Sequence, residues 1–233
     1  MTKPKTIFAL STPAGKSAIA VVRVSGKDAF SAINKISTSM PKKEKQSKIN
    51  KIIDENGKTI DQTITTFFKK PKSYTGENMV EISLHGGAST TNKLIELLLK
   101  NKNLRMAERG EFTRRAFDNN KLDLIQVEAV SDLINSETEI QRRQAINNLE
   151  GALSDKTKKI YDDLKKLLAN IEAIIDFSDE DLPSNIYLDI KEQKKNILKK
   201  LKKIIKNSEV GKKIRNGFVV GIVGKTNVGK SSF

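Results

Sequence analysis

The 233-residue sequence contains no cysteine, only one histidine and no long apolar run. The lack of cysteine excludes a disulfide framework and a thiolate metal site, and it is typical of a reducing compartment. The first residues do not form the apolar core of a signal peptide. No apolar stretch approaches the roughly 20 residues that are needed to span a bilayer. These absences predict a soluble, cytoplasmic protein that does not use a membrane.

Positive charge is present in excess, with 43 Lys and Arg against 28 Asp and Glu, a formal net charge of +15. Such a surplus is typical of proteins with a polyanionic partner such as nucleic acid. It is equally typical of a lysine-biased composition, because lysine greatly outnumbers arginine here and isoleucine and asparagine are also abundant. Both interpretations stay open, since charge alone does not establish RNA binding. The length allows one large domain or two ordinary ones.

The strongest single motif is at residues 224–231, where GKTNVGKS fits the pattern G-x-x-x-x-G-K-[ST]. The apolar residues before it, 218–223, predict a buried strand that leads into the loop. Glycines let successive backbone N–H groups point at phosphate oxygens, while Lys230 reaches the β- and γ-phosphates and the Ser231 hydroxyl can bind Mg²⁺. A chance glycine-rich turn is the weaker alternative, because strand, glycines, lysine and serine all agree.

A phosphate loop opens a nucleotide-binding domain and does not form one by itself. The magnesium-binding aspartate, the γ-phosphate sensor and the base-reading motif would all follow it. We therefore expect the 233 residues to be the front part of a longer protein, and we expect this part alone to be inactive as a nucleotide hydrolase.

The first half of the chain has the pattern of an α+β domain with a largely antiparallel sheet. Arg23 interrupts a strand between two valines, so it lies either on a solvated face or in a pocket. Glu81 lies on the polar face of another strand. The predicted strands cover 6–12, 18–25, 60–68 and 79–84, the predicted helices cover 29–36 and 88–100, and 41–59 is a polar stretch with a hairpin signal at Asn56-Gly57.

His85 follows the last of these strands and precedes two glycines. With no cysteine and no obvious Asp or His partner, it gives no signal of a metal site or of a base that activates a nucleophile. We expect a structural role for it.

From residue 111 onward the apolar residues recur at helical spacing. The predicted helices cover 111–120, 122–135, 140–149, 153–175 and 190–205, with an acidic, proline-containing break at 176–185. Nine lysines between Lys191 and Lys212 occupy the polar face of the last helix, which is either only solvated or in contact with RNA. The chain is thus expected to have an α+β domain at 1–120, a helical domain at 121–216, and the first strand and phosphate loop of an α/β nucleotide domain at 217–233.

Several segments together resemble a known family. They are AIAVVRVSG at 18–26, SYTGE at 73–77, LHGG at 84–87, RGEFT at 109–113, NKLDLIQVEA at 120–129 and IDF at 175–177. In this combination and order they resemble the MnmE (TrmE) family of tRNA-modification GTPases, from residue 6 to the end of the chain.

The resemblance implies a substrate and partners. Members of the family work with the flavoprotein MnmG to build a carboxymethylaminomethyl or aminomethyl group on C5 of the wobble uridine of tRNA. It further implies a homodimer whose N-terminal domain binds 5-formyl- or 5,10-methylene-tetrahydrofolate through Arg23, Glu81 and Lys121. Cations suit the glutamyl carboxylates of folate, and a carboxylate suits the amino-pyrimidine edge of the pterin. The helical domain is expected to be incomplete, because the family closes it with helices that follow the G domain.

The same resemblance implies GTP, Mg²⁺ and K⁺ at the phosphate loop. Asn227 would help to hold the potassium ion and Ser231 the magnesium ion, and no catalytic side chain is expected within this chain. The expected nucleotide-binding residues are Asn227, Val228, Gly229, Lys230, Ser231 and Ser232. Two alternatives remain: another GTPase, such as a ribosome-assembly factor with a fused RNA-binding domain, and a binding module without enzymatic activity.

Overall fold

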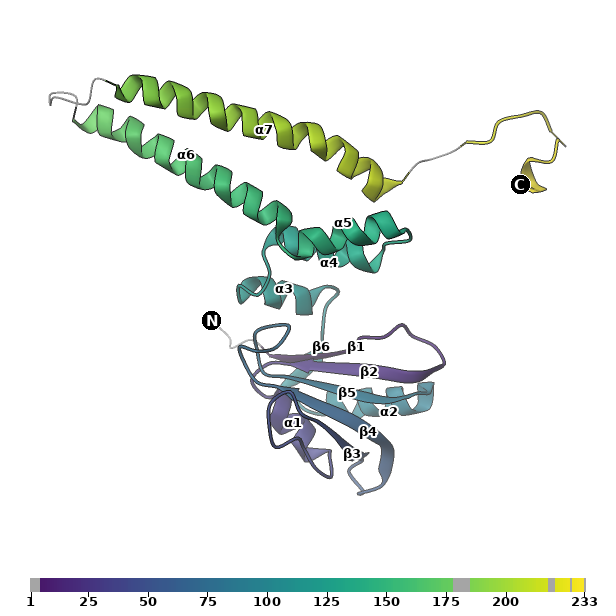
Figure 1. The fold of residues 1–233 in the computed structure, drawn as a ribbon. Coiled ribbons are helices and arrows are strands. Elements are labelled where there is room, and N and C mark those ends of the chain that lie inside the picture. The colour runs from purple at the N-terminus through teal and green to yellow at the C-terminus, as the bar shows by residue number, and fades with distance from the viewer. Residues whose placement is uncertain (1–4, 178–184, 218–220, 227, 233) are drawn as a thin grey trace. The chain divides into compact units, whose positions relative to one another are not determined.

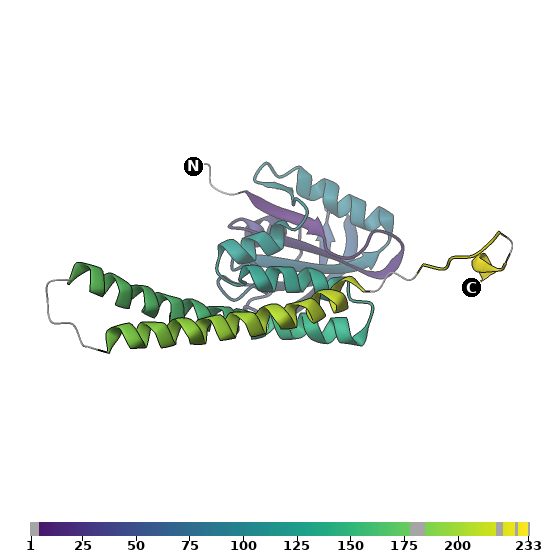
Figure 2. The same ribbon diagram turned by 90° about the horizontal axis from the view of Figure 1, so that it is seen from above.

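The computed structural model describes residues 5–177, 185–217, 221–226 and 228–232. Contacts divide the chain into two units, Met1–Leu124 and Ile125–Phe233. Each unit is described by itself below (Figures 1 and 2). Within the described ranges, no helix is both long enough and apolar enough to cross a membrane.

The first unit is built on a six-stranded sheet with the strand order β3-β4-β5-β2-β1-β6. Neighbouring strands pair antiparallel, except that β6 runs parallel to β1. This confirms the α+β class and the largely antiparallel sheet that the sequence predicts. The strands are β1 (Thr6–Leu10), β2 (Ser17–Ser25), β3 (Ser47–Ile53), β4 (Thr59–Phe68), β5 (Met79–Gly86) and β6 (Leu104–Met106).

One face of the sheet packs against α1 (Ala29–Lys35) and α2 (Ala88–Leu99), because most of the large apolar residues of the strands point to that side. Val22, Val24 and Ile82 are fully buried there together with Ile33 of α1 and Leu98 of α2. The residues between them in the sequence therefore point to the other face of the sheet. That second face is where Arg23 and Glu81 lie.

Two strands were not predicted. The strand β3 lies inside the polar stretch 41–59 and is an edge strand that buries only Asn50 and Ile52. The other, β6, has only three residues. The hairpin signal at Asn56-Gly57 is confirmed, because Asp54 Oδ1 accepts hydrogen bonds from the N–H groups of Asn56 (2.9 Å) and Lys58 (2.8 Å) between β3 and β4.

The sequence shows no obvious acidic partner for His85, but the structure places Asp61 beside it. Its Nδ1 lies 2.8 Å from Asp61 Oδ1, and its backbone N–H donates to Asp61 Oδ2 at 2.8 Å. The pair forms across the antiparallel strands β4 and β5, which bring together residues that are 24 positions apart. The imidazole is 75% exposed, so the contact fixes the end of β5 and agrees with a structural role.

The short helix α3 (Glu111–Asp118) follows β6 in the first unit. The helices of the second unit then follow as predicted: α4 (Leu124–Ile134), α5 (Glu139–Leu149), α6 (Ala152–Asp176) and α7 (Ile186–Asn216). A capping box of Thr138 and Gln141 begins α5. Gly151, with φ of 95°, permits the left-handed turn between α5 and α6.

The long helices α6 and α7 lie side by side and antiparallel, as both views show (Figures 1 and 2). Ile160 of α6 and Ile197 of α7 are the buried residues of this seam. The ion pair of Lys200 with Asp163 at 2.6 Å and the hydrogen bond of Asn170 with Gln193 at 3.4 Å set the register of the two helices.

The expected strand at 218–223 lies partly outside the described residues, at 218–220. Residues 221–223 have no regular secondary structure, and no described strand pairs with them. The chain forms one turn of 3-10 helix, η1 (Lys230–Ser232), at the end of the phosphate-loop motif.

Candidate functional site

Arg23 and Glu81 form a direct ion pair on the second face of the sheet. They are register partners on the neighbouring central strands β2 and β5. Glu81 Oε1 accepts from Arg23 Nε at 2.8 Å and lies 2.8 Å from Nη2. Both side chains are about three-quarters buried, with 26% of each exposed. The guanidinium carbon lies 5.2 Å from the ring centre of Tyr74 and 5.6 Å from that of Phe112, within the range of cation–π attraction.

Tyr74 belongs to a loop, residues 73–77, which we call the site loop. The Tyr74 hydroxyl lies 2.9 Å from Thr113 Oγ1 of α3, and the Thr75 carbonyl accepts from Asn119 Nδ2 at 2.8 Å. The loop turns at Gly76, whose φ of 77° favours glycine. A Cβ at this position would come within 2.9 Å of Asn119 Cβ and 3.2 Å of Lys121 Cγ. Gly76 thus allows the site loop to lie directly against the side chain of Lys121.

A charged network behind the site loop fixes it to α3. Arg115 donates to Glu77 Oε2 at 2.9 Å and to Glu111 Oε1 at 3.0 Å, and Arg105 makes two bonds to Glu111 at 2.6 and 2.7 Å. Burial acts to raise the pKa of Glu111, but the hydrogen bonds from Arg105, from the Glu108 N–H and from Arg115 outweigh it and lower this pKa to about 2. Glu111 is therefore ionised at any physiological pH.

The three folate-site residues predicted from the resemblance thus have two different placements. Arg23 and Glu81 are in contact with each other, while Lys121 is exposed and lies against Gly76 of the site loop. Sequence reasoning gave no role to Tyr74, Phe112, Glu77 or Arg115. The only signal for Tyr74, Glu77 and Phe112 was that 73–77 and 109–113 are among the segments that carry the resemblance, and Arg115 had no signal.

The phosphate loop has its lysine folded over the loop backbone. Lys230 Nζ donates to the Gly224 carbonyl at 2.9 Å and also to the Lys225 carbonyl. Gly229 has φ of 85°, and a Cβ on Gly224 would come within 3.2 Å of the Val228 side chain. Gly229 therefore adopts the left-handed backbone that favours glycine, while Gly224 packs closely against Val228. Ser231 and Ser232 lie exposed in η1, and Asn227 lies outside the described residues.

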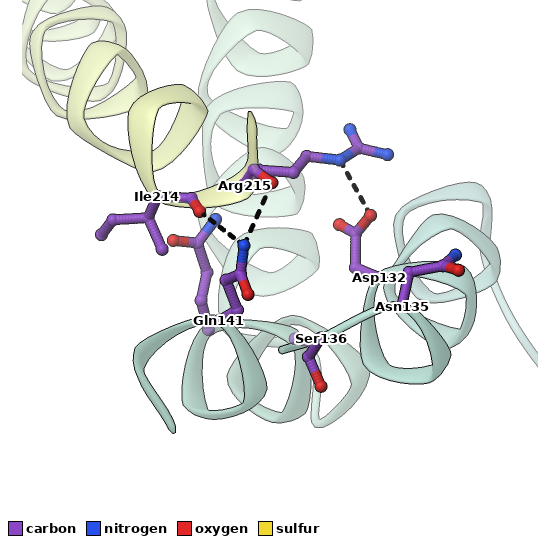
Figure 3. A pocket seen from close by; sticks show the side chains of 8 residues that line it. Asp132, Asn135, Ser136, Gln141, Ile214 and Arg215 are labelled. Atoms are coloured by element: carbon purple, nitrogen blue, oxygen red, sulfur yellow. Dashed lines mark hydrogen bonds and ion pairs between the residues drawn. The ribbon is translucent and has the colours of Figure 1, made fainter. Parts of the chain in front are cut away.

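The end of α7, eight residues before the phosphate loop, is held by side chains of α4 and α5 (Figure 3). Gln141 Nε2 donates to the carbonyls of Ile214 at 3.2 Å and Arg215 at 3.4 Å, and Arg215 Nε lies 2.8 Å from Asp132 Oδ1. The hollow between them has a volume of about 50 Å³. That is room for a water molecule or two, not for a nucleotide or a folate.

Acidic and histidine side chains do not gather elsewhere into a metal site: the described ranges contain no group of three or more that could hold an ion.

Comparison with known proteins finds a family model that matches each of the two units. Residues 6–121 match the family model for the GTP-binding protein TrmE N-terminus, and residues 124–219 match the model for the MnmE helical domain. Relatives that are named tRNA modification GTPase MnmE include those of Pelagibacter ubique (strain HTCC1062), 43% identical over 228 residues, and Clostridioides difficile (strain 630), 41% identical over 232 residues. Each alignment covers 97% of this chain, and it covers 52% of the first relative and 50% of the second.

The chain spans about half the length of the curated relatives that it matches, and its residues match the models of the TrmE N-terminus and the MnmE helical domain. The two models follow one another in the order that the sequence segments predict. The chain belongs to the MnmE (TrmE) family.

Proposed function

We propose that this chain supplies the folate-binding part, the helical part and the phosphate loop of a GTPase that modifies C5 of the wobble uridine of tRNA. The observation that carries the proposal is the match of two consecutive family models over residues 6–219, followed by a complete G-x-x-x-x-G-K-[ST] motif. The proposed limits of the three parts are 1–120, 121–216 and 217–233.

The phosphate loop fits a nucleotide. Its glycines leave space beside the loop backbone for a ligand. Its Lys230 ammonium already lies at the loop, where it would meet phosphate oxygens. Bound GTP would supply the phosphoryl group that is transferred to water, with Mg²⁺ and K⁺ balancing its charge. Val228, Gly229, Lys230 and Ser232 would hold the phosphates, Ser231 would add a hydroxyl ligand for Mg²⁺, and Asn227 would help to hold K⁺.

The Arg23–Glu81 pair fits one end of a tetrahydrofolate. Arg23 uses Nε and Nη2 on a single carboxylate oxygen, so Nη1 of Arg23 and Oε2 of Glu81 have no side-chain partner within the described ranges. A donor and an acceptor are thus offered side by side, beside two aromatic rings. The exposed ammonium of Lys121 adds a positive charge for a carboxylate. We therefore assign Arg23, Glu81 and Lys121 to one site for 5-formyl- or 5,10-methylene-tetrahydrofolate.

The proposed partners are a second copy of the chain, the flavoprotein MnmG and tRNA. The support for them is family membership, together with the names of the relatives, which are tRNA modification GTPases. A ribosome-assembly GTPase with a fused RNA-binding domain receives no support, because both matched models are those of the MnmE family.

Nucleotide hydrolysis tests the proposal at Lys230 and Ser231. In the natural protein, Lys230→Ala or Ser231→Ala should lower potassium-dependent GTP turnover at least about 100-fold, since each change removes charge stabilisation in the transition state. Lys225→Ala is the matched control, because position 225 is variable in the motif and its backbone carbonyl is retained. Turnover of both variants within twofold of wild type would contradict the assignment of the loop.

A further inference from the structure

The surplus positive charge of the chain is concentrated in one helix. The sequence of α7 contains eleven Lys and Arg against three Asp and Glu, whereas that of its neighbour α6 contains five against five. More than half of the net charge of +15 therefore belongs to α7. A general bias toward lysine would raise the positive charge of both helices alike, so the difference in net charge between α6 and α7 needs another cause.

The lysines of α7 are also regularly spaced around the helix. At 100° per residue, five of them fall within one arc of about 80°, and no other residue between positions 191 and 206 falls in that arc. We call this set the lysine stripe: Lys191, Lys195, Lys199, Lys202 and Lys206. Its members are three or four residues apart, which places neighbouring Cβ atoms about 5–6 Å from each other. At 1.5 Å per residue the stripe is about 22 Å long.

The lysine stripe is unneutralised. All five side chains are exposed, and none forms an ion pair with a side chain in the described ranges. By contrast, Lys200 of the same helix, which lies outside the arc, is paired with Asp163 of α6. Five like charges at this spacing repel one another, so they destabilise the free helix.

The stripe is on the side of α7 away from its apolar seam. Ile197, which is buried against α6, lies about 160° around the helix from Lys199. An amphipathic helix that lies on a membrane inserts its apolar face, whereas the apolar face of α7 packs in part against α6. The lysine stripe offers five exposed ammonium groups, and their natural partner is a row of phosphates.

We propose that the lysine stripe is a docking surface for the phosphate backbone of structured RNA, and that it binds the body of the tRNA substrate. This inference rests on the proposed function for the identity of the RNA. Lysine acts as a point charge and reads no base edges, so the contact positions the RNA without selecting its sequence. Any folded tRNA should therefore bind the stripe, whatever its anticodon.

A tRNA-binding experiment tests this surface. Fluorescence anisotropy measures how a labelled, unmodified tRNA transcript binds to the 233-residue chain over a range of KCl concentrations. The test variant replaces all five stripe lysines by glutamine (K191Q/K195Q/K199Q/K202Q/K206Q). The control removes the same total charge from exposed lysines of the first unit (K42Q/K43Q/K51Q/K58Q/K102Q). A third variant replaces the stripe lysines by arginine. Circular dichroism checks that helix content is kept, because Lys, Gln and Arg have similar helix propensities.

The stripe variant should bind at least about tenfold more weakly at moderate salt, and its slope of log K against log [KCl] should fall by about 3–5, close to one per lysine. The control should change affinity less than threefold, and the arginine variant should bind like wild type. Equal loss in the stripe and control variants would mean that only overall charge matters, and it would overturn the proposal. So would an absence of tRNA binding by wild type, or a stripe effect confined to phosphatidylserine vesicles. The outcome is separable from that of the proposed function, because the stripe variant should retain the GTP turnover of the natural protein.

Discussion

Arg23 lies in a central strand, where an unpaired charge would strongly destabilise the fold. Its cross-strand neighbour Glu81 neutralises the charge, and the rings of Tyr74 and Phe112 cover part of the guanidinium. Removing either partner leaves the other three-quarters buried and unpaired, which typically costs more than the pair contributes. An ion pair with spare hydrogen-bonding atoms at such a position is better explained by ligand binding than by stability.

We therefore expect Arg23→Ala and Lys121→Ala each to weaken 5-formyl-tetrahydrofolate binding by about 1.5–3 kcal/mol, the scale of a hydrogen bond to a charged group. Isothermal titration calorimetry measures this directly. Lys58→Ala, in the exposed turn between β3 and β4, is the control and should bind like wild type. Affinities within twofold of wild type for both site variants would show that folate binds elsewhere or not at all.

The pH dependence of stability should report on Glu111. Its folded pKa of about 2 is below the ordinary value of 4.5, so its ionised form stabilises the fold above about pH 5. That contribution is lost as the pH falls through the range from 5 to 2. In wild type we expect it to be about 3 kcal/mol of unfolding free energy, given that one pKa unit corresponds to about 1.4 kcal/mol.

Urea unfolding of wild type and Glu111→Gln at a series of pH values measures this contribution. The variant should be less stable at pH 7, and its stability should fall less between pH 5 and 3 than that of wild type. Glu96→Gln, an exposed position on α2, is the control. Parallel curves for wild type and Glu111→Gln would contradict the lowered pKa.

Among the elements, those with a clear apolar period were predictable. Strands β2, β4 and β5 alternate with period two, and α6 and α7 have apolar residues at helical spacing. Strand β3 was not predicted because an edge strand needs to bury few apolar residues. Strand β6 was not predicted because three residues are too few to show a period. The His85–Asp61 contact was not predicted because it depends on the pairing of two strands and not on local sequence.

The candidate site was less predictable than the fold for the same reason. Arg23 and Glu81 are 58 residues apart and meet only through the register of β2 with β5. No periodic pattern contains that register, so the resemblance to a family was needed to name the two residues together. Arg115 was missed altogether, because a buried arginine in a short polar helix looks like a solvated one until its two carboxylate partners are placed.

The α6–α7 hairpin should depend on its buried seam. Ile197 is 5% exposed and Ile205, eight residues later in the same helix, is 63% exposed. Ile197→Ala should destabilise the second unit by about 2 kcal/mol or more, because it leaves a cavity, while Ile205→Ala should cost only a few tenths. Amide hydrogen exchange of α6 and α7 measures both variants, and β2 and β5 of the first unit serve as an internal reference. Equal effects of the two substitutions would contradict the packing of this seam.

At the scale of the whole molecule, the proposed function needs several chemically different parts of one chain. Arg23 and Lys121 would hold the one-carbon carrier, Lys230 would hold the nucleotide phosphates, and the lysine stripe would hold the RNA. The first two assignments follow from membership of the MnmE family, while the third follows from the charge distribution of α7. The parts can therefore be tested separately.

The modified nucleosides of cellular tRNA give the most direct test of the central claim, that this chain belongs to a wobble-uridine-modifying GTPase. The measurement is mass spectrometry of nucleosides from total tRNA of cells that carry Lys230→Ala in the chromosomal gene, compared with cells that carry the control Lys225→Ala. We predict that 5-carboxymethylaminomethyluridine and 5-aminomethyluridine derivatives fall below about a tenth of their normal level with Lys230→Ala, as expected when a phosphate-binding lysine is lost, and stay normal in the control. Normal levels in the Lys230→Ala cells, with the protein present in normal amount, would contradict the account.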